Sequence, residues 1–219
     1  MSEFSSEPLA ARMRPSTIVE VVGQRHILGE GKLLRRVIEA DRLTNVIFYG
    51  PPGCGKTTLA EVIAKTTKRN FVRLSGVLSG VADIRRICDR ARNELGGKGT
   101  ILFIDEIHRF NKSQQDVLLP YVEDGTVVLI GATTHNPNFF INTPLTSRSL
   151  VFELKALSPD EIAEVLKRAL DDREKGCGAI PSRIDDDALF FLATVSDGDA
   201  RHALTALEIA MRSTPKPKA

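Results

Sequence analysis

Residues 50–57 read GPPGCGKT, and this stretch decides how the rest of the chain is interpreted. It fits the pattern GxxxxGK followed by Ser or Thr, in which glycines let the backbone turn its N–H groups inward around a phosphate. The helix predicted next, from Lys56 to about Lys68, starts with unpaired N–H groups and a positive dipole end that favour the same anion. We expect Lys56 to reach the β- and γ-phosphates of a nucleotide, and the Thr57 hydroxyl to bind Mg²⁺. The expected nucleotide contacts in this loop are Pro52, Gly53, Cys54, Gly55, Lys56, Thr57 and Thr58.

The segments on either side of this loop have the order that the motif requires. Residues 45–49 (NVIFY) are short and apolar, as a buried strand is. After the loop, apolar residues recur at helical spacing over 59–64. An ordinary glycine-rich turn would not need this strand–loop–helix context, so the sequence predicts a nucleotide-binding loop.

Composition sets only wide limits on the function. The chain has 219 residues, of which 42% are hydrophobic and 26% charged, and its net charge of +2 neither requires nor excludes nucleic acid. No apolar run approaches the length of a membrane span, and residues 1–7 lack the basic and apolar regions of a signal peptide. The cysteines Cys54, Cys88 and Cys177 have no metal-ligand spacing, so we expect a reducing, cytoplasmic environment.

Short apolar strands alternate with helices from residue 32 to residue 154. The predicted strands are 45–49, 71–74, 101–104, 127–130 and 150–154, and the predicted helices are 32–42, 56–68, 81–95 and 112–123. We expect residues 1–30 to be mostly irregular, and Pro120 to kink or shorten the last of these helices. The alternation predicts an α/β fold, with a mostly parallel five-stranded sheet between layers of helices.

The pattern changes at residues 158–161 (SPDE), where a proline in the first turn and two acidic residues favour a helix start. Beyond this point we predict only helices, at about 159–173, 185–195 and 199–212. We therefore place a domain boundary near residue 156, with an α/β domain over 1–156 and a small all-α domain over 157–213. Residues 214–219 are predicted to be a disordered tail, or the point where a longer chain was cut.

Two carboxylates, Asp105 and Glu106, follow the buried strand 101–104, at the strand ends where open α/β sheets bind ligands. Asp105 suits a contact to Mg²⁺, directly or through water, and Glu106 is placed to orient and polarise an attacking water. A helix-capping acidic pair is the alternative, but the phosphate-binding loop upstream favours the functional interpretation. Either Thr133 or Thr134, after the next strand, would hydrogen-bond the γ-phosphate or that water, unless both are plain turn threonines.

Three stretches, taken together, resemble one family. They are GPPGCGKTTLA at 50–60, FIDEIHRFNKSQQD at 103–116 and IGATT at 130–134. The combination resembles the clamp-loader-like AAA+ ATPases, and most of all the replication-associated recombination protein A family, to which a eukaryotic Werner-helicase-interacting protein is related. The more specific pieces are HRFNK at 108–112 and DGDAR at 197–201. The resemblance covers residues 8–212 and implies a P-loop AAA+ domain followed by a helical lid domain.

The resemblance also implies roles for single residues. Arg148 matches the arginine finger that reaches into a neighbouring subunit's nucleotide. Arg201 matches the arginine that touches the γ-phosphate from the lid of the same subunit. Thr133 or Thr134 matches the polar sensor after the fourth strand, and residues 15–26 match the segment that covers the adenine. Within that segment the expected adenine contacts are Val21, Val22 and His26.

The function that the resemblance implies is a DNA-dependent ATPase of the replication-associated recombination type. It would hydrolyse ATP, with Mg²⁺ as cofactor, at stalled replication forks or single-strand/duplex DNA junctions during replication, recombination and repair. The implied partners are DNA, a single-stranded DNA-binding protein and further copies of the chain, which form a tetramer through a C-terminal helical region missing here. The implied location is the cytoplasm, at the nucleoid.

Two other classes of function stay open on the sequence. A Holliday-junction branch-migration motor or a clamp-loader subunit would share the threonines after the fourth strand and the arginine finger. A branch-migration motor should also carry a winged-helix domain, which is not visible in this sequence. The other class is a scaffold that binds ATP without turnover. Glu106 argues against a scaffold, since non-hydrolysing subunits commonly lose this carboxylate.

Overall fold

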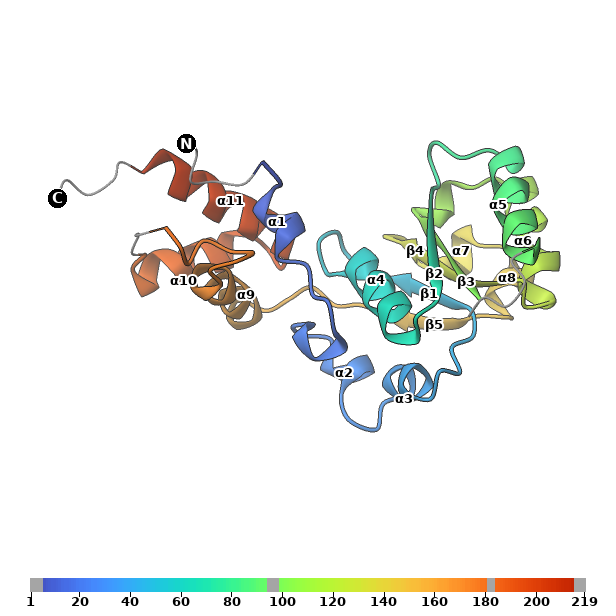
Figure 1. The fold of residues 1–219 in the computed structure, drawn as a ribbon, viewed down its shortest axis with the longest axis horizontal. Helices are drawn as coiled ribbons and strands as arrows, with labels where there is room; N and C mark the ends of the chain where they lie inside the picture. The colour runs from blue at the N-terminus through green and yellow to red at the C-terminus, as the bar shows by residue number, and fades with distance from the viewer. Residues whose placement is uncertain (1–5, 94–98, 181–183, 215–219) are drawn as a thin grey trace.

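The computed structural model describes residues 6–93, 99–180 and 184–214. Its centre is a sheet of five parallel strands in the order β2-β3-β4-β1-β5 (Figure 1). The strands are β1 (Val46–Tyr49), β2 (Asn70–Ser75), β3 (Thr100–Asp105), β4 (Val127–Thr133) and β5 (Leu150–Glu153). All five predicted strands are present, and the predicted parallel α/β sheet is confirmed.

Helices cover both faces of this sheet. On one side lie α3 (Leu33–Glu39) and α4 (Lys56–Thr67), and on the other lie α5 (Val81–Asn93) and α6 (Lys112–Glu123). Successive residues of a strand point to opposite faces. In β3, Phe103 therefore packs in the cluster with α3 and α4, whereas Ile104 packs in the cluster with α5 and α6.

Pro120 does not shorten α6, so that part of the prediction was wrong. The helix runs over all of the predicted range and ends with the N–H of Asp124 donating to the Pro120 carbonyl at 3.0 Å. Its start is fixed by a capping box between Asn111 and Gln114, and its apolar face is buried through Leu118 and Val122. These interactions outweigh the single helical hydrogen bond that proline cannot donate.

The N-terminal residues are more ordered than the sequence suggested. They form α1 (Leu9–Arg12), the 3-10 helix η1 (Ile18–Glu20) and α2 (Arg25–Leu28). Long-range packing explains α1, because Leu9 is completely buried among C-terminal helices and its N–H donates to Glu208 Oε2 at 3.0 Å. Thus α1 packs with the helical part of the protein, although it falls within the range 1–156 that we assigned to the α/β domain.

Three further short helices were also not predicted. They are the 3-10 helix η2 (Ile107–Arg109), α7 (Pro137–Phe140) and α8 (Thr143–Thr146). Each has only one turn, which is too short to show a helical apolar pattern.

The C-terminal part consists of α9 (Pro159–Asp171), α10 (Asp186–Val195) and α11 (Ala200–Ser213), which we call the lid. These helices and α1 enclose a core of their own, which supports our proposal of a separate helical domain after residue 156. Of the predicted tail 214–219, Thr214 is the C-cap of α11, and residues 215–219 lie outside the described residues.

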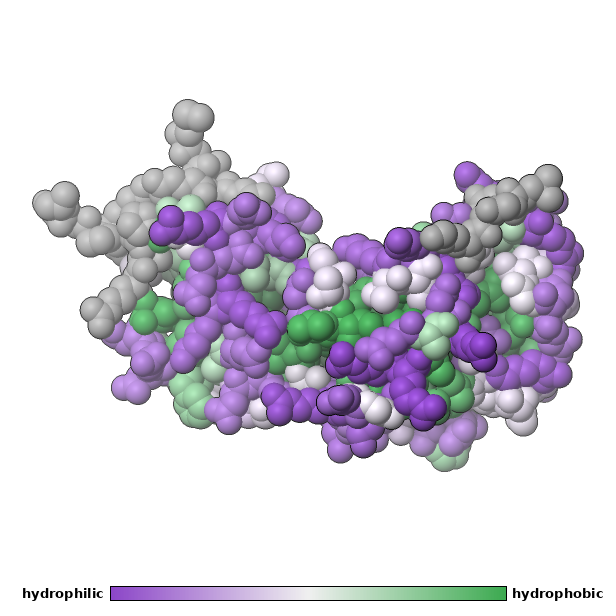
Figure 2. Space-filling model, turned by 60° about the horizontal axis from the view of Figure 1, so that its bottom comes forward, coloured by the Kyte–Doolittle hydropathy of each residue, from purple (hydrophilic) through white to green (hydrophobic). Residues whose placement is uncertain are grey.

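The lid stands apart from the sheet, and the chain between β5 and α9 and the chain after α1 both cross from one part to the other (Figure 1). Figure 2 shows apolar residues across the middle of one face, with polar residues over much of the rest. Among the described residues, no helix is both long and apolar enough to span a bilayer.

We predict that Leu9→Ala lowers the free energy of unfolding by about 2–5 kcal/mol, because it leaves a cavity in the core shared by α1 and the lid. Urea unfolding followed by circular dichroism measures this change. Leu33→Ala is the matched control, since Leu33 is 50% exposed and its truncation should cost less than about 1 kcal/mol. Equal losses in the two variants would show that α1 does not hold the lid core together.

Candidate functional site

A cavity of about 270 Å³ lies where the sheet domain and the lid meet. Its walls are the loop before α4, the ends of β3 and β4, the N-terminal segment between Ala10 and Val22, and helices α9 and α11. The predicted site residues that line it are Val21, Val22, Pro52, Gly53, Cys54, Gly55, Lys56, Thr57, Thr58, Asp105, Glu106, Thr134 and Arg201. The structure thus brings together residues that are up to 180 positions apart along the chain.

The loop between β1 and α4 is shaped by glycines with positive φ. Gly53 has a φ of 67° and Gly55 one of 101°, a region in which other L-residues are strained. Gly55 is also the N-cap of α4, so the first N–H groups of this 12-residue helix have no partner within the helix. This helix end, with Lys56 and Thr57 on the cavity wall, favours an anion such as phosphate.

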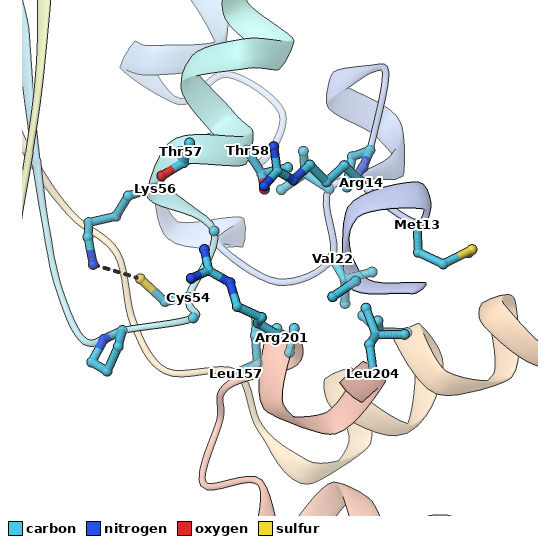
Figure 3. Close-up of a pocket in the computed structure, with 18 of the residues that line it drawn as sticks. Met13, Arg14, Val22, Cys54, Lys56, Thr57, Thr58, Leu157, Arg201 and Leu204 are labelled. Carbon is cyan, nitrogen blue, oxygen red and sulfur yellow. Dashed lines mark hydrogen bonds between the residues drawn. The ribbon is translucent and has the colours of Figure 1, made fainter. Parts of the chain in front are cut away.

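Lys56 is buried, and its ammonium is held by the loop itself. Nζ donates to the carbonyl oxygens of Gly50 and Pro51, both at 2.7 Å, and lies 3.9 Å from Cys54 Sγ (Figure 3). Burial raises the pKa of the Cys54 thiol, and the Lys56 charge opposes this shift. Cys54 is therefore a neutral, packed part of the loop, while Lys56 lies on the cavity wall with its ammonium bound to loop carbonyls.

Asp105 and Glu106 lie at the edge of the cavity where β3 ends. Asp105 Oδ2 pairs with Arg73 Nη2 at 2.5 Å, so a cation from the neighbouring strand β2 holds this carboxylate. Glu106 has a φ of 54° and a ψ of 46°, a left-handed backbone that is uncommon outside glycine. Its carboxylate Oε2 lies 3.3 Å from His108 Nε2. The site therefore contains two carboxylates with different neighbours, one paired with arginine and one with histidine.

The two threonines at the end of β4, of which Thr133 is the last residue of the strand, have different environments. The sequence left open which of them faces the site. Thr134 is exposed and lines the cavity. Thr133 is completely buried, and its hydroxyl is 2.9 Å from His108 Nδ1. Thr134 is thus the residue placed to contact a bound molecule, whereas Thr133 contacts the side chain that reaches Glu106.

Besides Thr133, two predicted site residues do not line this cavity. His26 Nε2 is 2.8 Å from the Glu153 carbonyl oxygen, so the structure does not bring His26 to the expected adenine site. Arg148 is exposed, and its guanidinium pairs with Glu123 at 2.8 Å and donates to the Pro144 carbonyl at 2.9 Å. A role for Arg148 at the cavity of its own chain is therefore excluded in this arrangement.

Sequence reasoning found only part of the apolar end of the cavity, namely Val21 and Val22. Figure 3 shows Met13, Val22 and Leu204 gathered at the end opposite Lys56. Ala10, Leu157 and Val165 also line the cavity. The helical apolar pattern of the lid predicts that Val165 and Leu204 face a core, but it does not show that α1 and the loop before α4 complete the wall. This end suits the flat apolar surface of an aromatic base.

The lid also contacts the loop between β1 and α4 directly. Asp199 caps α11 by accepting the N–H of His202 at 3.0 Å, and a Cβ placed on Gly53 would lie 2.0 Å from the Asp199 carboxyl group. Two positions further on, Arg201 extends from the first turn of α11 toward the same loop (Figure 3). The lid therefore presents one negative and one positive side chain to the place where phosphates would lie.

Arg14 and Arg168 are further cations on the cavity wall that the sequence did not single out. Arg14 Nη1 pairs with Glu61 of α4 at 3.1 Å, which ties the chain after α1 to the helix that follows the glycine-rich loop. Arg168 Nη1 donates to the Glu20 carbonyl at 2.8 Å, which ties α9 to η1. No local motif marks these two residues, because both interactions join segments that are distant in sequence.

Comparison of the sequence with known families and proteins agrees with this geometry. The sequence model described as "ATPase family associated with various cellular activities (AAA)" matches residues 46–156. Replication-associated recombination protein A of Escherichia coli K12 is 50% identical over 209 residues, covering 95% of this chain and 47% of that protein. ATPase WRNIP1 of Dictyostelium discoideum is 44% identical over 216 residues, covering 95% of this chain and 24% of that protein. The chain spans about half the length of the curated bacterial relatives it matches.

Among solved structures, the RuvB Holliday junction branch migration motor of Thermotoga maritima has the same fold. Its TM-score is 0.73 and its sequence identity is 32%, and the match covers 90% of this chain and 64% of that one. The identity is lower than for the proteins named for replication-associated recombination, although the coverage of this chain is similar.

We predict that Gly53→Ala destabilises the protein more than Gly125→Ala, by about 1–3 kcal/mol. Both glycines have nearly the same φ, 67° and 73°, so the backbone strain of the two variants is matched. Only the Cβ at position 53 meets the Asp199 carboxyl group, whereas position 125 has open space. Chemical unfolding of both variants measures the difference, and equal losses would mean that the lid does not rest on the loop.

Proposed function

The chain belongs to the AAA family of ATPases, and we propose that it binds and hydrolyses ATP as part of a DNA-dependent ATPase of the replication-associated recombination type. The main support for the proposal is that one cavity is lined by Lys56, by the pair Asp105–Glu106 and by Arg201. These groups are a phosphate-binding cation, an acidic pair for metal and water, and a second cation from the lid. Together they are the groups that phosphoryl transfer to water requires.

In this proposal the phosphates lie on the N-terminal end of α4. The loop N–H groups and the helix dipole stabilise their charge, and Lys56 turns from the carbonyls of Gly50 and Pro51 to the β- and γ-phosphates. Glu106 orients the attacking water and polarises it toward the γ-phosphorus. Arg201 contacts the γ-phosphate from the lid, and the base lies at the apolar end that Met13, Val22 and Leu204 form.

The residues on the cavity wall fit a magnesium ion held together with the nucleotide. Thr57 and Asp105 both line the cavity and offer the oxygen ligands that Mg²⁺ prefers. Within the described residues, no group of three or more His, Cys, Asp or Glu side chains is arranged to hold a metal. Phosphate and water oxygens would therefore complete the coordination, as is usual for Mg²⁺. When bound, the ion neutralises the charge on the phosphate oxygens.

Arg148 is proposed to act on the nucleotide of a neighbouring copy of the chain. Its side chain is 43% exposed and lies outside the cavity of its own chain, as a group that works in trans must. The exposed pair with Glu123 is worth only about 0–1 kcal/mol, so a neighbouring phosphate would easily displace it. This role depends on contact between subunits.

The whole protein's setting is likewise a proposal. The name of its relatives, replication-associated recombination protein A, supports action on DNA at stalled forks or single-strand/duplex junctions. We further propose that the full-length protein is a tetramer built through a C-terminal region, acts with a single-stranded DNA-binding protein, and works in the cytoplasm at the nucleoid.

A Holliday-junction motor is the second candidate function, favoured by the structural likeness to RuvB. The higher identity to the recombination proteins favours the first proposal.

We predict that Glu106→Gln abolishes ATP hydrolysis and leaves ATP affinity nearly intact, because Glu106 acts on the water and not on the nucleotide. Lys56→Ala should instead weaken ATP binding by about 1.5–3 kcal/mol, since it removes a charge-assisted contact. Fluorescence titration with a labelled ATP analogue measures affinity, and phosphate release measures turnover. The matched control for lost lysine charge is Lys65→Ala, at an exposed position on the same helix. Equal loss of ATP affinity in Glu106→Gln and Lys56→Ala would refute this division of roles between the two residues.

We also predict that turnover of the wild-type protein rises when forked DNA is added, and rises less with a Holliday junction. Stimulation by the Holliday junction alone would favour the branch-migration motor. Tight ATP binding with no turnover, even with DNA present, would instead identify a nucleotide-binding scaffold.

A further inference from the structure

His108 connects Glu106 to Thr133. It lies in η2, two residues after Glu106, and its imidazole contacts Glu106 just beyond β3 and Thr133 at the end of β4. Nε2 is 3.3 Å from Glu106 Oε2, and Nδ1 is 2.9 Å from Thr133 Oγ1. The His108 side chain is only 8% exposed, so water does not compete freely for either nitrogen.

The hydrogen-bond partners of Thr133 determine which atoms donate and which accept in the series Thr133–His108–Glu106. The backbone N–H of His135 donates to Thr133 Oγ1 at 3.0 Å, so the Thr133 hydroxyl already accepts one hydrogen bond. Its own hydrogen is then available for His108 Nδ1, at 2.9 Å, which is closer than the alternative acceptor, the His135 carbonyl, at 3.4 Å. A neutral imidazole that accepts at Nδ1 carries its hydrogen on Nε2, the ring nitrogen that lies 3.3 Å from Glu106 Oε2.

The surroundings of His108 favour this neutral form. Burial lowers the pKa of His108 below its usual value, and the neighbouring His135 and Arg109 lower it further. The Glu106 carboxylate acts in the opposite direction, but burial is the larger effect. His135 and Phe140 pack edge-on against the imidazole, with ring centroids at 4.4 and 6.1 Å, and these contacts limit rotation of the ring.

We propose that His108 is a positioning residue that orients the Glu106 carboxylate through Nε2–H and links it to the end of β4 through Nδ1. The proposal rests on the proposed hydrolysis of ATP, in which Glu106 acts on water. Thr134 follows Thr133 directly and lines the cavity, so a contact between Thr134 and the γ-phosphate would shift the end of β4. The hydrogen bond between Thr133 and His108, and the close contact between His108 and Glu106, then carry that shift to the carboxylate. In this way the carboxylate would be oriented according to whether the γ-phosphate is present.

The kinetic test uses two substitutions that keep shape and remove polar atoms. His108→Phe retains an aromatic ring, and Thr133→Val retains the size of the threonine. Each should lower kcat about 10-fold or more, the loss usual for partners that orient a reactive group, and leave KM and nucleotide affinity within about 2-fold. Because His108 and Thr133 act through the same series of contacts, kcat of the double variant should fall no further than kcat of the more impaired single variant.

Thr100→Val is the matched control, because Thr100 is another buried threonine but lies at the opposite end of β3. It should leave kcat unchanged. The proposal is overturned if the losses of His108→Phe and Thr133→Val multiply, or if neither variant lowers kcat. It is also overturned if Thr100→Val is as impaired as Thr133→Val, since that would indicate a general effect of removing a buried hydroxyl.

A spectroscopic test does not depend on turnover. In ¹⁵N-histidine-labelled protein, the His108 ring should be neutral at pH 7, with the hydrogen on Nε2, and Thr133→Val should shift the tautomer toward Nδ1–H. A Nδ1–H tautomer in the wild type, or an unchanged ring in Thr133→Val, would overturn the proposal. If the wild type hydrolyses ATP no faster than Glu106→Gln, the proposed function fails, and the ring spectrum alone decides whether His108 holds Glu106.

Discussion

Parallel pairing of the five strands is the constraint on which the site depends, because it makes every strand end at the same edge of the sheet. The central order β3-β4-β1 places the loop after β1, the acidic pair at the end of β3 and the threonines at the end of β4 side by side. The register is definite, with Tyr49 opposite Thr133 and Ile104 opposite Gly131. A slip of one residue would turn the neighbouring side chains to the other face, and the two threonines would exchange places.

The sheet edge forms one side of the cavity, and segments near the two ends of the chain form the other side. Leu9 is buried in the lid core, and Arg14, five residues later, pairs with Glu61 on α4. The N-terminal segment therefore joins the lid to α4, the helix that begins with Lys56. From the other end of the chain, Asp199 rests against Gly53, and Arg201 faces the same loop. A ligand between these parts would contact both, so its binding and the position of the lid are coupled.

Local patterns were enough to predict the residues that follow the strands. The loop at 50–57 and the acidic pair after β3 each lie within a few residues of a buried strand, and short-range periodicity located both. The choice between Thr133 and Thr134 was not accessible, because it depends on which face of β4 is turned to the cavity. The packing of Leu9 in the lid core was not accessible for a related reason. Its buried neighbours there start at Leu157, and its N–H donates to Glu208, 199 positions away, so no local periodicity encodes these contacts.

The claim that the lid and the phosphate-binding loop form one nucleotide site is tested most directly by a distance across the cavity. Spin labels at Lys65→Cys on α4 and Lys167→Cys on α9 occupy exposed positions, whereas the three native cysteines are buried. Pulsed electron resonance should give a shorter and narrower distance distribution with a non-hydrolysable ATP analogue than with ADP, and Arg201→Ala should remove that difference. The same distribution with both nucleotides would contradict a site that the lid completes.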